Sequence, residues 1–416
     1  MNFKSISVGI FLAVRQIRRA NIWTNILIVF VMTLTFLNLV VVGGILVGLI
    51  EASVESNRTH YSGDILISNL LEKTYIEGST KMVKFIEGLP EVSAVTARYV
   101  ESGRLESGYK ERTNQGDILD NASGLVTGID PVKENNVTDI ASKVIEGEYL
   151  DTSDEDQILI GGNLLFKYSP IDSPGLRNLK TADIGSRVRL VINGNTKEVT
   201  IKGIIKSKVG ELDQRIFIVD RVLRGMIGRT DYNVDEIAIK LKDPLYVGQV
   251  KQVLEDEGFG RLAKIRTWNE AQPKFLIDIK DAFSLLGDII GSVGLVVASI
   301  TIFIVIFVNA ITRRKYIGIL KGVGIDSFAI EVAYIIQSLF YAVAGTAIGI
   351  VVLYFVLVPF IDAHPINFPF SDGILVATVS GTLWRALALL VATVIAGYIP
   401  AKIVSRQNTL DAILGR

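Results

Sequence analysis

The residue types that most often carry catalytic chemistry are scarce in this sequence. It has no cysteine and only two histidines, His60 and His364, which lie far apart in the chain. Without cysteine there is no thiolate nucleophile and no disulfide. The sequence contains no Gly-Lys pair, so it lacks the loop with which P-loop proteins hold ATP. We therefore expect no catalytic, cofactor-binding or metal-binding residues, with His60 at the surface just past the first apolar run and His364 in a loop.

The segment with the most distinctive pattern is short and basic. Residues 313–326 read Arg-Arg-Lys-Tyr-Ile-Gly-Ile-Leu-Lys-Gly-Val-Gly-Ile-Asp and separate two apolar runs, 289–311 and 329–357. Its arginines and lysines can stay in water while its isoleucine and leucine side chains enter a groove or the membrane interface. The pattern predicts a loop with a brief amphipathic helix at a membrane face.

The composition indicates a membrane protein with a sizeable polar portion. Of 416 residues, 49% are hydrophobic and 21% are charged, and the mean hydropathy is +0.41. Basic and acidic residues both number 43, so the net charge gives no support for a nucleic-acid partner. No cleavable signal peptide is evident, so the first apolar run, residues 26–50, is expected to remain as an anchor.

Four apolar runs, each long enough to cross about 30 Å of hydrocarbon, set the expected architecture. We predict an α-helical membrane protein of four transmembrane helices, with a large α+β extracytoplasmic domain inserted between the first and second. The expected segments are a cytoplasmic amphipathic helix on the membrane surface (1–25), the first span (26–50), the outer domain (51–283) with a stalk helix at about 270–288, the second span (289–311), a cytoplasmic coupling loop (312–328), the third span (329–357), an external loop (358–373), the fourth span (374–399) and a cytoplasmic tail (400–416).

Inside the outer domain, alternating and amphipathic patterns predict both strands and helices. Asn193-Gly194 between two alternating runs is the strongest hairpin signal. Residues 268–286 have an apolar stripe and run directly into the second span, which favours a stalk over a surface helix of the domain. The predicted strands are 64–68, 92–100, 187–192, 198–201, 216–219 and 236–241, and the predicted helices are 80–88 and 245–258.

The distribution of lysine and arginine between the spans predicts the topology. Basic residues occur in the N-terminal segment, in the 313–321 loop and in the tail, whereas the 359–372 loop has none. By the positive-inside rule the three basic segments are cytoplasmic. Both termini are therefore expected in the cytoplasm, and the long domain outside.

Two features within the predicted spans are candidate functional positions. Arg385 is near the middle of the fourth predicted span, where a charge costs about 2.5–3.5 kcal/mol. It either faces a dimer interior or substrate cavity, or marks the outer interface with Trp384 if the span starts near Leu383. Gly345 and Gly349 have the spacing of a helix-packing face.

Residues 313–326 also resemble the coupling segment of the ABC permease superfamily that includes MacB-type exporters, lipoprotein-releasing permeases and FtsX. In that superfamily the second membrane helix runs into an R-x-x-E-I-G-I-L-x-x-x-G signature, and here Tyr316 replaces its acidic residue. The resemblance assigns ATPase coupling to Arg313, Arg314, Tyr316, Ile317, Gly318, Ile319, Leu320, Lys321 and Gly324.

Several further stretches resemble the same permeases in matching order. Residues 124–131, Gly-Leu-Val-Thr-Gly-Ile-Asp-Pro, are similar to a strand and turn of the family's extracytoplasmic core domain. The other similar stretches are 145–150, 157–165, 184–190 and 199–205 in that domain, Pro400-Ala401-Lys402 at the end of the fourth span, and 409–414 in the tail, where Leu410 stands in place of the usual proline.

The resemblance implies a permease subunit of an ABC transporter in the bacterial cytoplasmic (inner) membrane that is not itself an enzyme. Its implied partners are two copies of a P-loop ATPase subunit, which bind ATP and Mg, a second permease chain in a homo- or heterodimer, membrane lipid, and a periplasmic adaptor or substrate-receiving protein. ATP-driven motion would then drive lipoprotein release or efflux of peptide- or drug-like amphiphiles. The alternatives are an FtsX-like signal transmitter that activates a cell-wall hydrolase without transport, and an ATPase-independent sensor.

Overall fold

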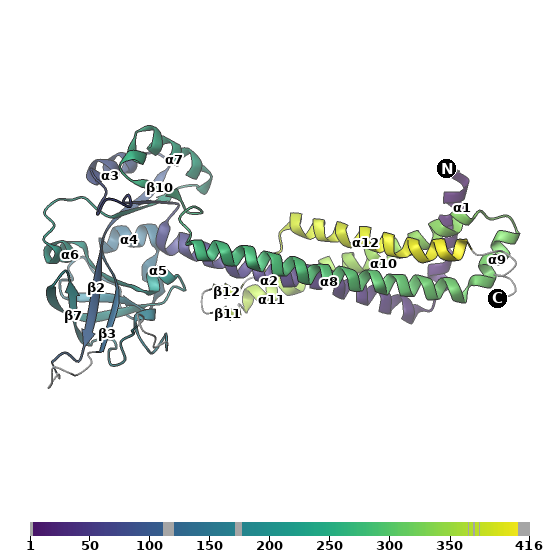
Figure 1. Cartoon of the computed structure of the whole chain (residues 1–416), viewed down its shortest axis with the longest axis horizontal. Coiled ribbons are helices and arrows are strands. Elements are labelled where there is room, and N and C mark those ends of the chain that lie inside the picture. The colour runs from purple at the N-terminus through teal and green to yellow at the C-terminus, as the bar shows by residue number, and fades with distance from the viewer. Residues whose placement is uncertain are drawn as a thin grey trace. The chain divides into compact units, whose positions relative to one another are not determined.

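The computed structural model describes residues 3–110, 120–170, 177–364, 366–368, 371–373 and 375–406. The chain divides into two compact units, each described here by itself (Figure 1). The helical unit consists of Met1–Ile50, Asp278–Asn367 and Asp372–Arg416, and the sheet unit consists of Glu51–Ile277 with Phe368–Ser371.

Among the described residues, the sheet unit is built on ten connected strands. They are β1 (Ile65–Ser68), β2 (Val92–Ser107), β3 (Asp120–Ile129), β4 (Val144–Gly147), β5 (Gln157–Gly161), β6 (Arg187–Ile192), β7 (Asn195–Ile205), β8 (Arg215–Val219), β9 (Glu236–Leu241) and β10 (Lys264–Thr267). The order β10-β1-β9-β2 is antiparallel throughout. From β2 the pairing continues through β3, β8, β5, β7 and β6 and returns to β2, which closes a six-strand ring.

Strand β2 belongs to both halves of this arrangement. Its first half pairs with β9 in the open sheet, and its second half pairs with β3 and β6 in the ring. At 16 residues it is far longer than the predicted strand 92–100. The hairpin predicted at Asn193-Gly194 is confirmed, because β6 and β7 pair up to Ile192 and Asn195 and both turn residues have positive φ, 49° and 83°.

Short helices cover the two faces of the strands. They are α3 (Ser79–Glu87), α4 (Pro131–Thr138), α5 (Gly210–Asp213), α6 (Asp220–Ile227) and α7 (Val247–Asp256). Helix α4 begins where the sequence dictates: Asp130 accepts hydrogen bonds from the backbone N–H groups of Val132 and Lys133, and Pro131 occupies the first turn. The apolar core on one face includes Ile158, Ile160, Leu190, Ile216 and Ile239, which are fully buried.

The helical unit contains α1 (Phe3–Arg19), most of α2 (Ile22–Asn57) and of α8 (Lys274–Thr312), α9 (Arg314–Gly322), α10 (Ser327–Val352), α11 (Val358–Ala363) and α12 (Val379–Ser405). Two single π-turns, η1 (Arg58–Ser62) and η6 (Leu353–Leu357), follow α2 and α10. By length and composition, four described helical segments can cross a membrane: Ile22–Ser62, Lys274–Thr312, Ser327–Ala363 and Val379–Ser405. The prediction of four membrane helices with a separate mixed sheet domain is confirmed at this level.

Two described helical segments continue beyond the predicted third and fourth spans. The fourth helix does not stop at Pro400 but continues through it to Ser405. Its close packing explains this, since a Cβ on Gly397 would lie only 2.6 Å from Ser338 Oγ of α10, so tertiary contacts hold the helix where proline removes one backbone hydrogen bond. The third helical segment also continues past Pro359 to Ala363, because this proline occupies the first turn of α11, where no N–H is required.

The helix predicted at 268–286 begins six residues later than expected, at Lys274. Pro273 directly precedes the helix and disfavours helical backbone in the residue before it. His60, expected at the surface, is buried in η1 with its Nδ1 3.1 Å from the Thr138 carbonyl oxygen. Burial, followed by the charge of Lys143, lowers the pKa of His60.

Candidate functional site

The basic segment 313–326 folds into a short helix between two membrane-length helices. Helix α8 ends at Thr312, and α9 starts at Arg314 after a single non-helical residue. The helix ends because Gly324 has a φ of +97°, which allows the Ile325 N–H to bond back to the Leu320 carbonyl oxygen at 3.0 Å. Asp326 then caps α10 by accepting a hydrogen bond from the Phe328 N–H. The predicted brief helix is confirmed.

The two sides of α9 differ sharply in burial. Ile317 is only 3% exposed and Gly318 is buried. Tyr316, Ile319 and Val323 are 70%, 51% and 80% exposed. Because these three residues are spaced i, i+3 and i+7, they share one side of the helix. We call them the α9 apolar stripe; it is an exposed apolar surface carried by a helix whose other side is anchored.

A polar joint fastens α9 to the ends of α10 and α12. The Lys321 ammonium donates to the Ser405 carbonyl oxygen at 2.9 Å. The Ser405 hydroxyl donates to Glu331 Oε1 at 2.6 Å, and the Ser327 hydroxyl donates to the Ser405 carbonyl oxygen at 3.4 Å. The end of α12 therefore holds α9 in place, and a displacement of α9 would strain its contacts with both α10 and α12.

Arg385 lies in the seventh position of α12, about 9 Å along the helix axis from Val379. It is half-buried, and its Nη2 is 2.8 Å from where a Cβ on Gly43 of α2 would be. Gly43 in turn lies against Gly287 of α8, whose Cβ position is 3.2 Å from the Gly43 Cα. The guanidinium therefore fits over a surface of small residues among α2, α8 and α12.

Gly345 and Gly349 lie on the side of α10 that packs against α2. A Cβ on Gly345 would be 2.5 Å from Met32 Cβ, and one on Gly349 would be 2.4 Å from Phe36 Cδ1. The Thr33 hydroxyl donates to the Gly345 carbonyl oxygen at 3.1 Å. These contacts require residues without side chains at both positions.

The sheet unit contains a buried charge cluster that sequence reasoning missed. Its members come from η1, α4 and three strands and are Tyr61, Arg98, Glu134, Arg215 and Glu236. Arg98 donates to Glu134 Oε1 at 2.7 Å, and Arg215 donates to Glu236 Oε1 at 2.9 Å. The Tyr61 ring lies under both guanidinium groups, 5.1 Å from Arg98 Cζ and 4.8 Å from Arg215 Cζ.

Electrostatics inside the cluster favour the charged forms despite burial. Burial alone would lower the pKa of Arg98, but Glu134 and Glu236 outweigh it and raise this pKa. Burial raises the pKa of Tyr61, so its hydroxyl stays a donor and reaches Glu236 Oε1 at 3.1 Å. The two cations and two anions balance, which is the condition under which buried charges are tolerated.

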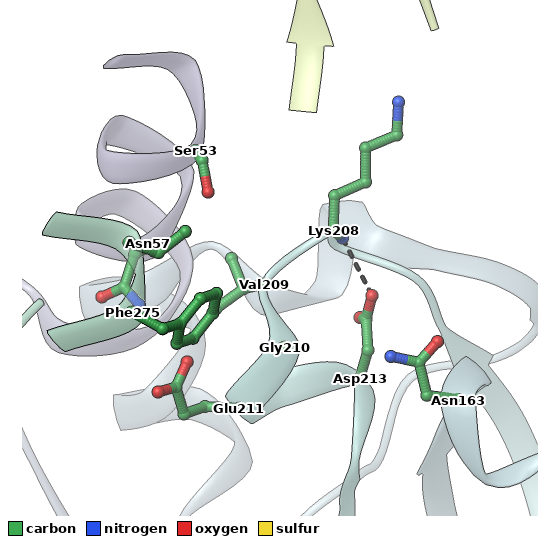
Figure 2. A pocket seen from close by; sticks show the side chains of 10 residues that line it. Ser53, Asn57, Asn163, Lys208, Val209, Gly210, Glu211, Asp213 and Phe275 are labelled. Atoms are coloured by element: carbon green, nitrogen blue, oxygen red, sulfur yellow. Dashed lines mark hydrogen bonds between the residues drawn. The ribbon is translucent and has the colours of Figure 1, made fainter. Parts of the chain in front are cut away.

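A small cavity of about 120 Å³ lies in the sheet unit, lined by both polar and apolar side chains from several elements (Figure 2). Both carboxylate oxygens of Asp213 accept hydrogen bonds, from the Ser207 backbone N–H at 2.7 Å and from the Lys208 backbone N–H at 3.0 Å. Burial raises the pKa of Glu211, which also lines the cavity. No group of three or more metal-ligating side chains gathers within the described ranges.

Comparison with known proteins defines the class of the helical unit. Residues 289–409 match the family model described as FtsX-like permease C-terminal. This match begins within α8 and includes the α9 segment, α10 and α12. The helical unit thus carries an FtsX-like permease domain, and the resemblance to ABC permeases predicted from residues 313–326 is confirmed.

Two curated proteins are similar over parts of their length. The lipoprotein-releasing system transmembrane protein LolC of Neisseria meningitidis serogroup B is 22% identical over 234 residues, which are 54% of this chain and 54% of LolC. A probable export ATP-binding/permease protein of Pseudomonas fluorescens is 22% identical over 191 residues, 43% of this chain and 27% of that protein. The chain therefore spans about half of the first relative and about a quarter of the second.

Two solved structures are similar to about half of the chain. The extracellular domain of the noncanonic ABC-type transporter YknZ from Gram-positive bacteria aligns with 49% of this chain and 99% of that domain. The periplasmic region of MacB from Actinobacillus actinomycetemcomitans aligns with 52% and 94%. Both have a TM-score of 0.33 and 12% identity, and no conclusion about function rests on them.

Proposed function

We propose that this chain is the permease subunit of an ABC transporter that transmits the ATP-driven motion of a partner ATPase to its sheet unit. The FtsX-like domain at 289–409 supports the class, and the two curated relatives belong to a lipoprotein-releasing and an export system by name. The work at the outer membrane face would be extraction or export of an amphiphilic substrate. ATP and Mg would be bound by the partner, two copies of which serve a pair of permease chains.

The observation that carries this proposal is the α9 apolar stripe. Three apolar side chains on an otherwise basic loop have no structural reason to face outward, since the opposite side of the same helix packs inward through Ile317. An exposed apolar helix side that is fixed to its own protein suits insertion into a groove of another protein. The joint at Ser405 supports transmission, because a push on α9 would move α10 and α12 together.

The proposed orientation places α9 and both termini in the cytoplasm, and the sheet unit between the first and second membrane helices on the outer side of the bacterial inner membrane. Basic residues at 313–321 and in the N-terminal segment support it through the positive-inside rule. The sheet unit follows α2 and precedes α8 in the chain, as such an insertion requires.

The stripe is tested by Ile319→Asp and Val323→Asp. Both side chains are at least half exposed, so the substitutions should leave the fold intact, yet they place a charge in the groove that the partner offers. We expect at least a tenfold loss of partner-dependent ATP hydrolysis. An unpaired charge buried at an interface lowers the binding free energy by about 2 kcal/mol or more. The matched control is Leu71→Asp, the same kind of change at a fully exposed residue of the sheet unit. Full ATPase coupling in both α9 variants would remove the stripe from the mechanism.

A further inference from the structure

Helix α1 packs against the start of α10, although the two segments are more than 300 residues apart in the sequence. A Cβ on Gly9 would be 2.8 Å from the Ala329 carbonyl oxygen and 2.7 Å from Val332 Cγ1, so α1 touches the first turns of α10. Ala13 is completely buried, and the Ser5 hydroxyl reaches Asp326, the cap of α10, at 3.4 Å. One side of α1 is therefore bound to α10 through small residues.

The other side of α1 is exposed and combines apolar with basic residues. Phe11 and Val14 are 61% and 44% exposed, and they lie roughly opposite Gly9 and Ala13 on the helix. Arg15, Arg18 and Arg19 are also exposed. No ion pair between described residues involves these three arginines. The helix sequence contains four basic residues and no acidic one.

The start of α2 continues this surface. Asn21 accepts a hydrogen bond from the Trp23 N–H and ends the turn between the two helices, and the Asn25 amide donates to the Ile17 carbonyl oxygen. Trp23 is 76% exposed. An exposed tryptophan at the end of a membrane helix is typical of the headgroup level. The three arginines of α1 thus precede, by eight residues or fewer, a tryptophan suited to that level.

We propose that the outward side of α1 is a binding site for anionic phospholipids. Phe11 and Val14 would enter the interface, and Arg15, Arg18 and Arg19 would bind phosphate-bearing headgroups. The combination of arginines and exposed apolar side chains favours a lipid over a free anion. A free anion would contact only the arginines, whereas a phospholipid can also bury the Phe11 side chain. Since α1 contacts Ala329 and Asp326, an occupied site would hold the start of α10. The binding itself does not depend on the proposed transport function.

The full chain is reconstituted in phosphatidylcholine vesicles that contain an increasing mole fraction of one brominated lipid, either phosphatidylglycerol or phosphatidylcholine. Bromine quenches tryptophan on contact, and the Trp23 signal is the difference between the chain and its Trp23→Phe variant. One basic residue at an anionic surface strengthens attraction about fivefold. We expect the brominated phosphatidylglycerol to quench Trp23 at a mole fraction at least about fivefold lower than the brominated phosphatidylcholine.

Substitution of Arg15, Arg18 and Arg19 by glutamine should abolish this preference. The matched control replaces three exposed lysines of the sheet unit, Lys81, Lys84 and Lys264, by glutamine and should retain it. Equal quenching by the two lipids in the unsubstituted chain would overturn the proposal. Loss of a co-purifying ATPase in the arginine variant without any lipid preference would assign this side of α1 to a protein partner instead, and would leave the proposed transport function standing.

Discussion

Replacement of Glu236 by glutamine tests the energetics of the buried charge cluster. The Glu236 carboxylate accepts hydrogen bonds from Arg215 at 2.9 and 3.2 Å, from Arg98 at 3.3 Å and from Tyr61 at 3.1 Å. Glutamine keeps the shape but removes the charge, so Arg98 keeps Glu134 while the buried Arg215 guanidinium loses the carboxylate with which it pairs. Removing one partner of a buried ion pair costs about 3–5 kcal/mol of unfolding free energy.

The pKa of Glu236 gives a second estimate of the unfolding free energy that its charge contributes. Burial would raise this pKa, but Arg215 and Arg98 outweigh burial and hold it at about 2, below the ordinary value of 4.5. The difference corresponds to about 3 kcal/mol. Because folding lowers the pKa, this stabilisation is complete above pH 4.5 and is lost as the pH falls to about 2. The two estimates agree.

Hydrogen exchange of the full chain in detergent measures the effect locally. Amides of β2 and β9, the strands that carry Arg98 and Glu236, should exchange about a hundredfold or more faster in the Glu236→Gln chain. The control is Glu270→Gln, because Glu270 pairs with Lys251 at 2.7 Å but is half exposed, and such pairs contribute about 0–1 kcal/mol. If Glu236→Gln and Glu270→Gln both leave the exchange rates of these amides nearly unchanged, the cluster contributes no net stability and the reasoning is wrong.

Three further predictions concern pH, packing and the intramembrane charge. Denaturant unfolding between pH 4.5 and about 2 should show a steeper loss of stability in the unsubstituted chain than in Glu236→Gln, and parallel curves would contradict the lowered pKa. Gly349→Ala should lower the thermal stability of the detergent-solubilised chain by about 1–3 kcal/mol, since its Cβ would meet Phe36, whereas Gly248→Ala, with open space around its Cβ, should not. Arg385→Leu should reduce ATP-dependent activity at normal membrane expression, and undiminished activity would favour a place at the outer interface.

The parts of the fold that the sequence predicted are those with a local signal. Apolar runs longer than a bilayer identified the four membrane-length helices, and the Asn193-Gly194 pair identified the hairpin. The α9 helix was predictable because its basic residues and its Gly324 terminator are adjacent in the chain. In each case, residues within a few turns determine the element.

The parts that were missed depend on distant residues. Arg98, Glu134, Arg215 and Glu236 look like surface positions in the sequence, and only the closure of β2 with its neighbours brings them together. Helix α12 passes through Pro400 because of its packing on α10, which no local rule expresses. The contact between α1 and α10 joins residues more than 300 positions apart, and small residues such as Gly9 give no directional signal.

The most direct measurement for the proposed function is purification of the tagged chain from its native membrane in mild detergent. Co-purifying proteins are identified by mass spectrometry, and ATP hydrolysis is measured with and without Ile319→Asp. The account predicts a stoichiometric partner that carries a P-loop, together with ATP hydrolysis that the α9 variant reduces. A pure preparation with no such partner and no hydrolysis would contradict the account and favour an ATPase-independent sensor.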